Sequence, residues 1–241
     1  MIKKFLRKIV LKEKASSESY IKYLRNIGVS IGDDVIIYSP SNSLIDITQP
    51  CLLKIGNHVR ITRGVIILTH DYSWSVLKSY EDSECLAGGI FGAQSPVNIG
   101  DNVFIGMNSV ITRGVTIGNN VIIGAGSIVT KDCEPDSVYA GNPAKRIMSV
   151  AEYRKKREQK QFEEAKVLAR TYYETYNKKP DASVFREYFI LFCSAKEAEK
   201  NEEFRAQMAT NCNFEATVAY MNSQGKKFSN FEEFLEACFT D

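Results

Sequence analysis

The chain has 241 residues, of which 44% are hydrophobic and 25% charged, an ordinary composition for a globular protein of one large domain or two modest ones. The net charge of +2 comes from residues 1–25, where eight Lys or Arg stand against two Glu, so we expect no nucleic-acid partner. The six cysteines are scattered without a C-x-x-C pair, which favours a reducing cytoplasm and argues against a zinc site.

Residues 1–27 are predicted to form a basic helix or cap. Hydrophobic side chains share one face of this helix, and Lys and Arg occupy the others; the hydrophobic set is Ile2, Phe5, Leu6, Ile9 and Val10. The segment lacks the long apolar core and small-residue cleavage site of a secretory signal, so none is expected. We expect the helix to cover one end of the repeat domain that follows. The alternative is peripheral contact of residues 1–14 with an anionic membrane.

Residues 28–148 carry a six-residue repeat. Aliphatic residues recur at every sixth position, as Ile99, Ile105, Ile111, Ile117, Ile123 and Val129, and the earlier Ile55, Ile61 and Ile67 have the same six-residue spacing. A period of six fits neither a helix nor a flat strand. It fits a short strand and a corner, three of which close a triangular coil of 18 residues with Ile99 stacked on Ile117 and Ile105 on Ile123. Glycines and corner pairs such as Asp101-Asn102 tolerate the tight turns. An ordinary β-sandwich with coincidental spacing is the alternative.

Residues 71–96 interrupt the repeat and are expected to protrude from a corner as a loop. Loops of this length in a compact domain are usually functional or disordered. The aromatic and acidic content favours function, through Tyr72, Trp74, Tyr80, Glu81 and Asp82.

Residues 149–241 are predicted to be helical. Residues 151–176 are long, charged and free of glycine, and residues 184–192 are apolar enough to be buried. Ser229 and Glu232 have the spacing of a capping box ahead of the last helix. No constellation of residues in this region suggests chemistry.

The chain has two histidines, of which His70 is the candidate catalytic base. His70 follows a repeat strand at a predicted corner and directly precedes the interrupting loop. An imidazole can accept a proton near neutral pH, and a general base contributes roughly 10²–10⁴ in rate. His58, in Gly56-Asn57-His58-Val59, is interpreted as a generic solvent-facing corner residue.

Three motifs resemble the hexapeptide-repeat acetyltransferases, and most nearly the galactoside, maltose and xenobiotic acetyltransferases. These motifs are Thr-His-Asp at 69–71, GAGSIVTKD at 124–132 and AGNPAKRI at 140–147, and the likeness covers roughly residues 28–148. The resemblance implies a mainly β fold, a left-handed parallel β-helix with a helical C-terminal extension and a protruding loop. It also implies a homotrimer whose active sites lie at the subunit interfaces and use acetyl-CoA, with no metal.

The same resemblance implies roles for individual residues. His70 acts as general base on an acceptor hydroxyl, and the backbone N–H of Met107 meets the oxyanion. The expected acetyl-CoA contacts are Phe104, Ala125, Thr130, Lys131, Lys145 and Arg146, the last three near the phosphates. On the acceptor side, we expect aromatic residues to stack on a sugar ring and carboxylates to hold hydroxyls; these residues are Asp71, Tyr72, Trp74, Tyr80, Glu81 and Asp82.

The leading hypothesis is O-acetylation of a sugar or polysaccharide precursor in the cytoplasm. N-acetylation of an amino sugar, including a nucleotide-linked one, needs the same base and cofactor and is left open. A metal-dependent carbonic anhydrase would require three histidine ligands, and the chain has two. A non-catalytic trimeric scaffold is the remaining alternative, against which the Thr-His-Asp and GAGSIVTKD motifs argue.

Overall fold

The computed structural model describes residues 10–240. The chain divides into two compact units, Met1–Tyr153 and Arg154–Asp241, which are described separately. Within the described residues, no helix is long and apolar enough to cross a membrane.

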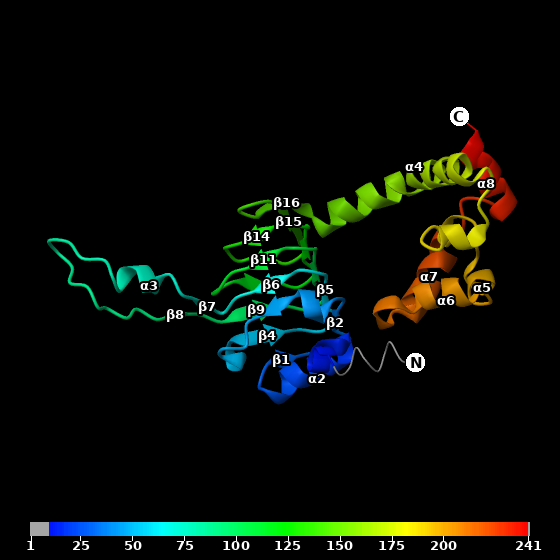
Figure 1. Cartoon of the computed structure of the whole chain (residues 1–241). Helices are drawn as coiled ribbons and strands as arrows, with labels where there is room; N and C mark the ends of the chain where they lie inside the picture. The colour runs from blue at the N-terminus through cyan, green and yellow to red at the C-terminus, as the bar shows by residue number, and fades with distance from the viewer. Residues whose placement is uncertain (1–9, 241) are drawn as a thin grey trace. The chain divides into compact units, whose positions relative to one another are not determined.

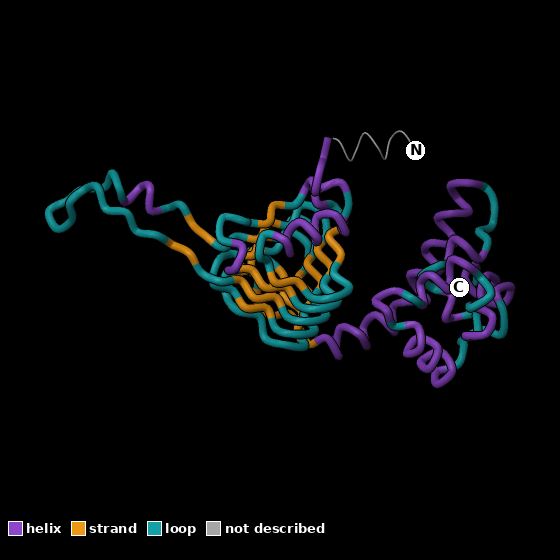
Figure 2. The backbone as a smooth tube through the Cα atoms, turned by 90° about the horizontal axis from the view of Figure 1, so that it is seen from below, coloured by secondary structure: helices purple, strands orange, loops and turns teal. Residues whose placement is uncertain are grey.

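The first unit is a three-sided coil of short parallel strands (Figures 1 and 2). Sheet A contains β1 (Ser30–Ile31), β4 (Leu53–Ile55), β9 (Val97–Ile99) and β12 (Thr116–Ile117). Sheet B contains β2 (Ile36–Ile37), β5 (Arg60–Ile61), β10 (Phe104–Ile105), β13 (Ile122–Ile123), β15 (Ser137–Ala140) and the antiparallel β16 (Lys145–Ser149). Sheet C contains β3 (Leu44–Ile45), β6 (Ile66–Ile67), β11 (Val110–Ile111) and β14 (Ile128–Val129). Because the chain visits A, B and C in turn, each corner recurs at the same edge one coil later.

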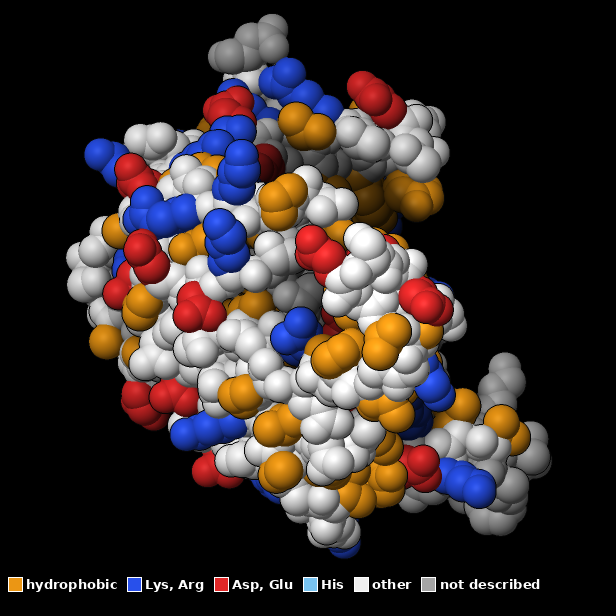
Figure 3. Space-filling view, turned by 90° about the vertical axis from the view of Figure 1, so that its left-hand side faces the viewer, with side chains coloured by type: hydrophobic (Ala, Val, Ile, Leu, Met, Phe, Trp, Pro, Cys, Tyr) orange, Lys and Arg blue, Asp and Glu red, His pale blue; other side chains and the backbone are white. Residues whose placement is uncertain are grey.

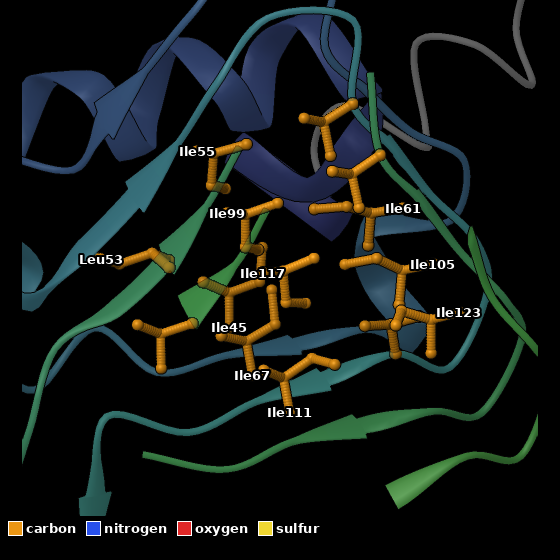
Figure 4. Packing of buried hydrophobic residues seen from close by; sticks show 14 of the residues in the cluster. Ile45, Leu53, Ile55, Ile61, Ile67, Ile99, Ile105, Ile111, Ile117 and Ile123 are labelled. Atoms are coloured by element: carbon orange, nitrogen blue, oxygen red, sulfur yellow. The ribbon is translucent and has the colours of Figure 1, made fainter. Parts of the chain in front are cut away.

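The predicted stacking of the aliphatic residues is confirmed. Ile99 pairs with Ile117 and Ile105 with Ile123, each offset by one coil of 18 residues. Figure 4 shows three columns inside the coil, one from each sheet: Ile55, Ile99 and Ile117; Ile61, Ile105 and Ile123; Ile45, Ile67 and Ile111. These side chains are almost fully buried. Their removal from water is the main favourable contribution to folding of the coil.

The corners use glycine and asparagine for different reasons. Asn102 and Asn120 adopt the left-handed conformation with φ of 55° and 56°, as the sequence predicts. Gly106 is needed instead for close approach between coils, since a Cβ there would lie 2.5 Å from the Ala125 nitrogen. The expectation that the glycines serve turn conformation is therefore wrong at this position. Here the backbones of two coils pack so closely that no side chain fits.

The first coil is covered at its N-terminal end by α2 (Ser17–Asn26), which follows the 3₁₀ turn η1 (Lys12–Ala15). The helix begins at a capping box between Ser16 and Ser19, and its buried Tyr20 and Leu24 belong to the same hydrophobic cluster as the coil. Short 3₁₀ turns η2 (Pro40–Asn42) and η3 (Pro50–Leu52) lie in the first coils. The amphipathic face predicted at Ile2, Phe5, Leu6 and Ile9 lies outside the described residues.

The segment that interrupts the repeat, here called the arm (residues 71–96), leaves the coil between sheets C and A. At its base β7 (His70–Asp71) pairs antiparallel with β8 (Ala93–Gln94), and α3 (Trp74–Leu77) is its one short helix. Figure 3 views the molecule from the side on which the arm projects and shows hydrophobic side chains exposed beside acidic ones. The arm exposes Leu86, Ile90 and Phe91.

The second unit is helical and has its own aromatic core. It contains most of α4 (Val150–Tyr176), then α5 (Ala195–Ala198), α6 (Glu202–Met208), α7 (Phe214–Gln224) and α8 (Phe231–Phe239), with 3₁₀ turns η4 (Ala182–Phe185), η5 (Phe189–Leu191) and η6 (Thr210–Cys212). Phe185, Phe189 and Phe192, from the predicted apolar segment, are buried there. The predicted capping box at Ser229 is wrong by one residue, because Asn230 is the N-cap and accepts a hydrogen bond from the Glu233 nitrogen.

Candidate active site

His70 lies at the corner between sheets C and A, at the root of the arm. Its Nδ1 is 2.5 Å from Oδ2 of Asp46, a residue at the same corner one coil earlier. Asp46 directly follows the buried Ile45 of β3, and its side chain is only 4% exposed. The rigid stack of the coil therefore sets the relative position of the two side chains.

The Asp46 carboxylate is held by several donors. The nitrogen and the hydroxyl of Thr69 donate to Oδ2 at 2.9 and 2.7 Å, and the Thr48 nitrogen donates to Oδ1 at 2.9 Å. Burial alone would raise the pKa of Asp46, but the hydrogen bonds from Thr69, Thr48 and His70 outweigh it and hold that pKa well below its ordinary value. An ionised carboxylate only accepts hydrogen bonds, so Nδ1 of His70 donates and a neutral ring carries its lone pair on Nε2.

His70 opens onto a hollow of about 550 Å³ at this corner. The walls come from three successive coils: Leu68, His70, Asp71 and Tyr72 from one, Thr112 and Arg113 from the next, and Thr130 from the one after. Of the residues predicted from the sequence, the hollow thus brings together His70, Asp71, Tyr72 and Thr130. The exposed Lys131 follows Thr130 at the same corner.

A second group of predicted residues lies at a different corner of the same chain, between sheets B and C. Phe104 is in β10, Met107 is in the turn that follows it, and Ala125 is in the corresponding turn one coil later. The Met107 carbonyl accepts a hydrogen bond from the Gly126 nitrogen at 2.7 Å, which joins the two turns. Phe104 and Met107 are exposed. Sheet C separates this corner from His70.

The three cations expected near the phosphates are not together within one chain. Lys131 follows a strand of sheet C, whereas Lys145 and Arg146 lie in β16 of sheet B. Arg146 donates to the Ser137 hydroxyl at 3.0 Å and lies 4.0 Å from Glu134. The three residues belong to different sides of the coil, so their expected place beside the phosphates stays a prediction that requires residues of two copies.

The outer residues predicted for acceptor binding do not line the hollow of their own chain. The Trp74 ring contacts that of Tyr72, with centroids 4.8 Å apart, and the Tyr80 hydroxyl donates to Asp82 at 2.5 Å. Glu81 is exposed beside them. Of the residues predicted to bind the acceptor, Asp71 and Tyr72 alone line the hollow of their own chain, because the chain leaves the coil after β7.

His58 has a more specific environment than a generic corner. Its Nδ1 is 2.9 Å from Oδ2 of Asp34, and the Arg60 guanidinium donates to the same oxygen at 2.6 Å. Burial would raise the pKa of Asp34, but the hydrogen bonds from His58 and Arg60 lower it. Because a buried arginine shares this carboxylate, the His58 pair is a structural ion-pair cluster at another corner.

Two residues of the site were missed by the sequence analysis, Asp46 and Arg113. The signal for Asp46 was its place directly after Leu44-Ile45, an aliphatic pair like the Ile66-Ile67 pair of the strand that leads to His70 one coil later. Arg113 stands in an Ile-Thr-Arg-Gly-Val run that also occurs at 61–65. Because the two runs are identical, the sequence did not indicate that Arg113 and Arg63 lie at different corners. Between residues 10 and 240, no group of three or more His, Cys, Asp or Glu could hold a metal ion.

Comparisons with known proteins show to which family the chain belongs. The model for the "Hexapeptide repeat of succinyl-transferase" matches residues 96–131. Protein CapG of Staphylococcus aureus is 45% identical over 134 residues, which cover 55% of this chain and 73% of CapG. The chain belongs to the hexapeptide-repeat acetyltransferase family. It is accordingly an acetyltransferase, and the resemblance predicted from the three motifs is confirmed.

Two further family members are similar over part of their length. A putative acetyltransferase of Schizosaccharomyces pombe is 39% identical over 100 residues, which cover 41% of this chain and 44% of that protein, so the chain spans less than half of it. The solved structure of a maltose O-acetyltransferase from Clostridium difficile 630 is 30% identical, with 61% of this chain and 81% of that chain covered and a TM-score of 0.40.

Proposed function

We propose that this hexapeptide-repeat acetyltransferase transfers an acetyl group from acetyl-CoA to a hydroxyl of a sugar or polysaccharide precursor, with His70 as general base. The observation that carries the proposal is the Asp46–His70 pair, which opens onto the hollow from a rigid corner. The carboxylate fixes Nδ1 as a donor and leaves Nε2 to accept a proton.

The chemistry follows from this arrangement. Nε2 takes the acceptor hydroxyl proton as its oxygen attacks the thioester carbonyl; the new C–O bond forms, the C–S bond breaks, and the proton passes to the departing thiolate. The negative oxygen of the intermediate needs a backbone donor. The exposed Met107 N–H fits this role, since no acceptor in residues 10–240 takes its hydrogen bond.

A homotrimer of left-handed coils would complete the site. His70, Thr130 and Lys131 lie at one corner and Phe104, Met107 and Ala125 at another, so one chain cannot place both groups on the same substrate. Cyclic symmetry brings one corner of each copy against a different corner of the next. In this assembly Lys131 of one copy and Lys145 and Arg146 of another would meet the acetyl-CoA phosphates. The exposed apolar side chains of the arm would then be covered by a neighbouring copy.

The acceptor side of the proposal places Trp74, Tyr80, Glu81 and Asp82 at the site of a neighbouring copy, with Asp71 and Tyr72 at their own. Stacked aromatic rings suit the C–H face of a sugar. An amino sugar would use the same base, and hydroxyl and amine acceptors assayed side by side separate O- from N-acetylation. We place the reaction in the cytoplasm, in keeping with the exposed free thiols of Cys51, Cys85 and Cys212.

Replacement of His70 by alanine tests the proposed function. We expect His70→Ala to lower kcat by about 10²–10⁴ while the Kd for acetyl-CoA, measured by calorimetry, stays unchanged. His58→Ala is the matched control and should keep its turnover per folded protein. Retention of kcat within about threefold in His70→Ala would contradict the assigned base.

A further inference from the structure

Arg113 is a cation on the wall of the hollow that the chemistry above does not use. It follows Thr112, whose nitrogen and hydroxyl both donate to the Val129 carbonyl, at 3.0 and 3.1 Å. Gly114 comes next with φ of 81°, so the turn is tight on both sides of the arginine. The base of the Arg113 side chain is therefore fixed by the coil.

Among the described residues, the guanidinium of Arg113 forms a single ion pair, and that pair is long. Its Nε is 3.9 Å from Oδ2 of Asp71, too long for a hydrogen bond, and the two side chains are 40% and 43% exposed. The other oxygen of Asp71 accepts from the Ser73 nitrogen at 2.7 Å, which turns that carboxylate toward the arm. A guanidinium carries five donors in a planar fork, and a pair at this distance leaves them available to a ligand.

Arg113 also shares its hollow with the proposed base. Among the described residues that line the hollow, it is the only Lys or Arg, and His70 lies in the same wall. A molecule whose hydroxyl reaches His70 therefore passes the guanidinium. Planar forks of this kind bind carboxylates and phosphates through two parallel hydrogen bonds.

We propose that Arg113 binds an anionic substituent, a carboxylate or a phosphate, of the acceptor, so that the preferred acceptor is an acidic sugar. The inference rests on the proposed function and names the class of its acceptor. When the acceptor anion arrives, it replaces Asp71 as the partner of the guanidinium. A neutral sugar leaves the Asp71–Arg113 pair as it is and gains nothing from it.

The test compares three acceptors that differ in charge: methyl galactoside, methyl galacturonate and galactose 1-phosphate. Wild-type enzyme should show a higher kcat/KM with at least one of the two acidic acceptors. Arg113→Gln should lower that kcat/KM about 10- to 100-fold and change the value for methyl galactoside less than about threefold. Arg113→Lys should fall between, because it keeps the charge and loses the fork. Arg186→Gln, at an exposed arginine of the helical unit, should leave the acid-to-neutral ratio unchanged.

The contrary outcomes are distinguishable. Preference for the neutral sugar, or an equal loss with all acceptors in Arg113→Gln, overturns the inference and leaves the acetyltransferase proposal standing. A raised KM for acetyl-CoA with an unchanged acid-to-neutral ratio shows that Arg113 contacts the cofactor phosphates, which also overturns it. Transfer to none of the three acceptors overturns the proposed sugar acetyltransferase, and the inference with it.

Discussion

Asp46→Asn is the substitution that probes the site most sharply without changing its shape. The amide must turn its NH₂ either toward Thr69 and His70 or toward the Thr48 nitrogen. In both orientations at least one buried donor loses its acceptor, which costs about 1–3 kcal/mol of unfolding free energy. In both, His70 loses its charged partner. A charge-assisted hydrogen bond contributes about 1.5–3 kcal/mol, so kcat should fall about 10- to 150-fold.

The assay has two parts, free-thiol release under saturating substrates and urea unfolding of the same preparations. Asp34→Asn is the matched control, since Asp34 also accepts from a histidine 24 residues later. The control should lose stability, because Arg60 loses its carboxylate, and should keep its turnover per folded protein. Turnover of Asp46→Asn within about threefold of wild type would refute the role given to Asp46.

Asp46 also predicts a pH dependence with a definite sign. Its pKa is lowered in the folded protein, so its stabilising contribution is complete above the unfolded pKa of about 4 and is lost as the pH falls through the folded value. The difference in unfolding free energy between wild type and Asp46→Asn should therefore shrink as the pH falls below about 4. A difference that instead grows at low pH would contradict this ionisation.

Three further predictions concern the cofactor, the arm and the coil. Lys131→Ala should raise the KM for acetyl-CoA about tenfold with little change in kcat, and an unchanged KM would remove Lys131 from the site. Trp74→Ala should raise the acceptor KM without dissociating the oligomer in light scattering; dissociation with acceptor binding intact would make the arm structural. Gly106→Ala should lower the unfolding free energy by about 1–3 kcal/mol, because its Cβ would meet the next coil. Gly92→Ala is the control, since a Cβ there would meet no atom within 4 Å, and equal losses would show that close packing does not require Gly106.

The coil could be predicted from the sequence because its signal is local and repeated. A period of six places Ile99, Ile105 and Ile111 inward without any long-range information. The same periodicity located His70, which follows Ile67 at the third position of a corner. The apolar segment at 184–192 was also predictable, since its aromatic density has no place outside a core.

The partners of His70 could not be predicted in the same way. They depend on which residues of successive coils lie at the same corner, and coils of unequal length change that alignment. Asp46 and His70 meet only because one coil, lengthened at its corners, separates them by 24 residues. Arg63 and Arg113 stand in identical five-residue runs, yet the first lies between sheets B and C and the second between sheets C and A. The position of the arm residues had no periodicity to fix it, which is why Tyr80, Glu81 and Asp82 were expected at a site they do not reach in their own chain.

Activity in mixed oligomers tests the shared, His70-dependent site most directly. His70→Ala removes the base from one corner, and Ala125→Glu places a charge at the other, exposed corner. Each variant alone should be nearly inactive. Refolded together in equal amounts, random mixing leaves about one interface in four with both corners intact, so about a quarter of wild-type activity should return. Mixtures as inactive as the separate variants, with mixed oligomers shown by native mass spectrometry, would contradict a site built from two copies.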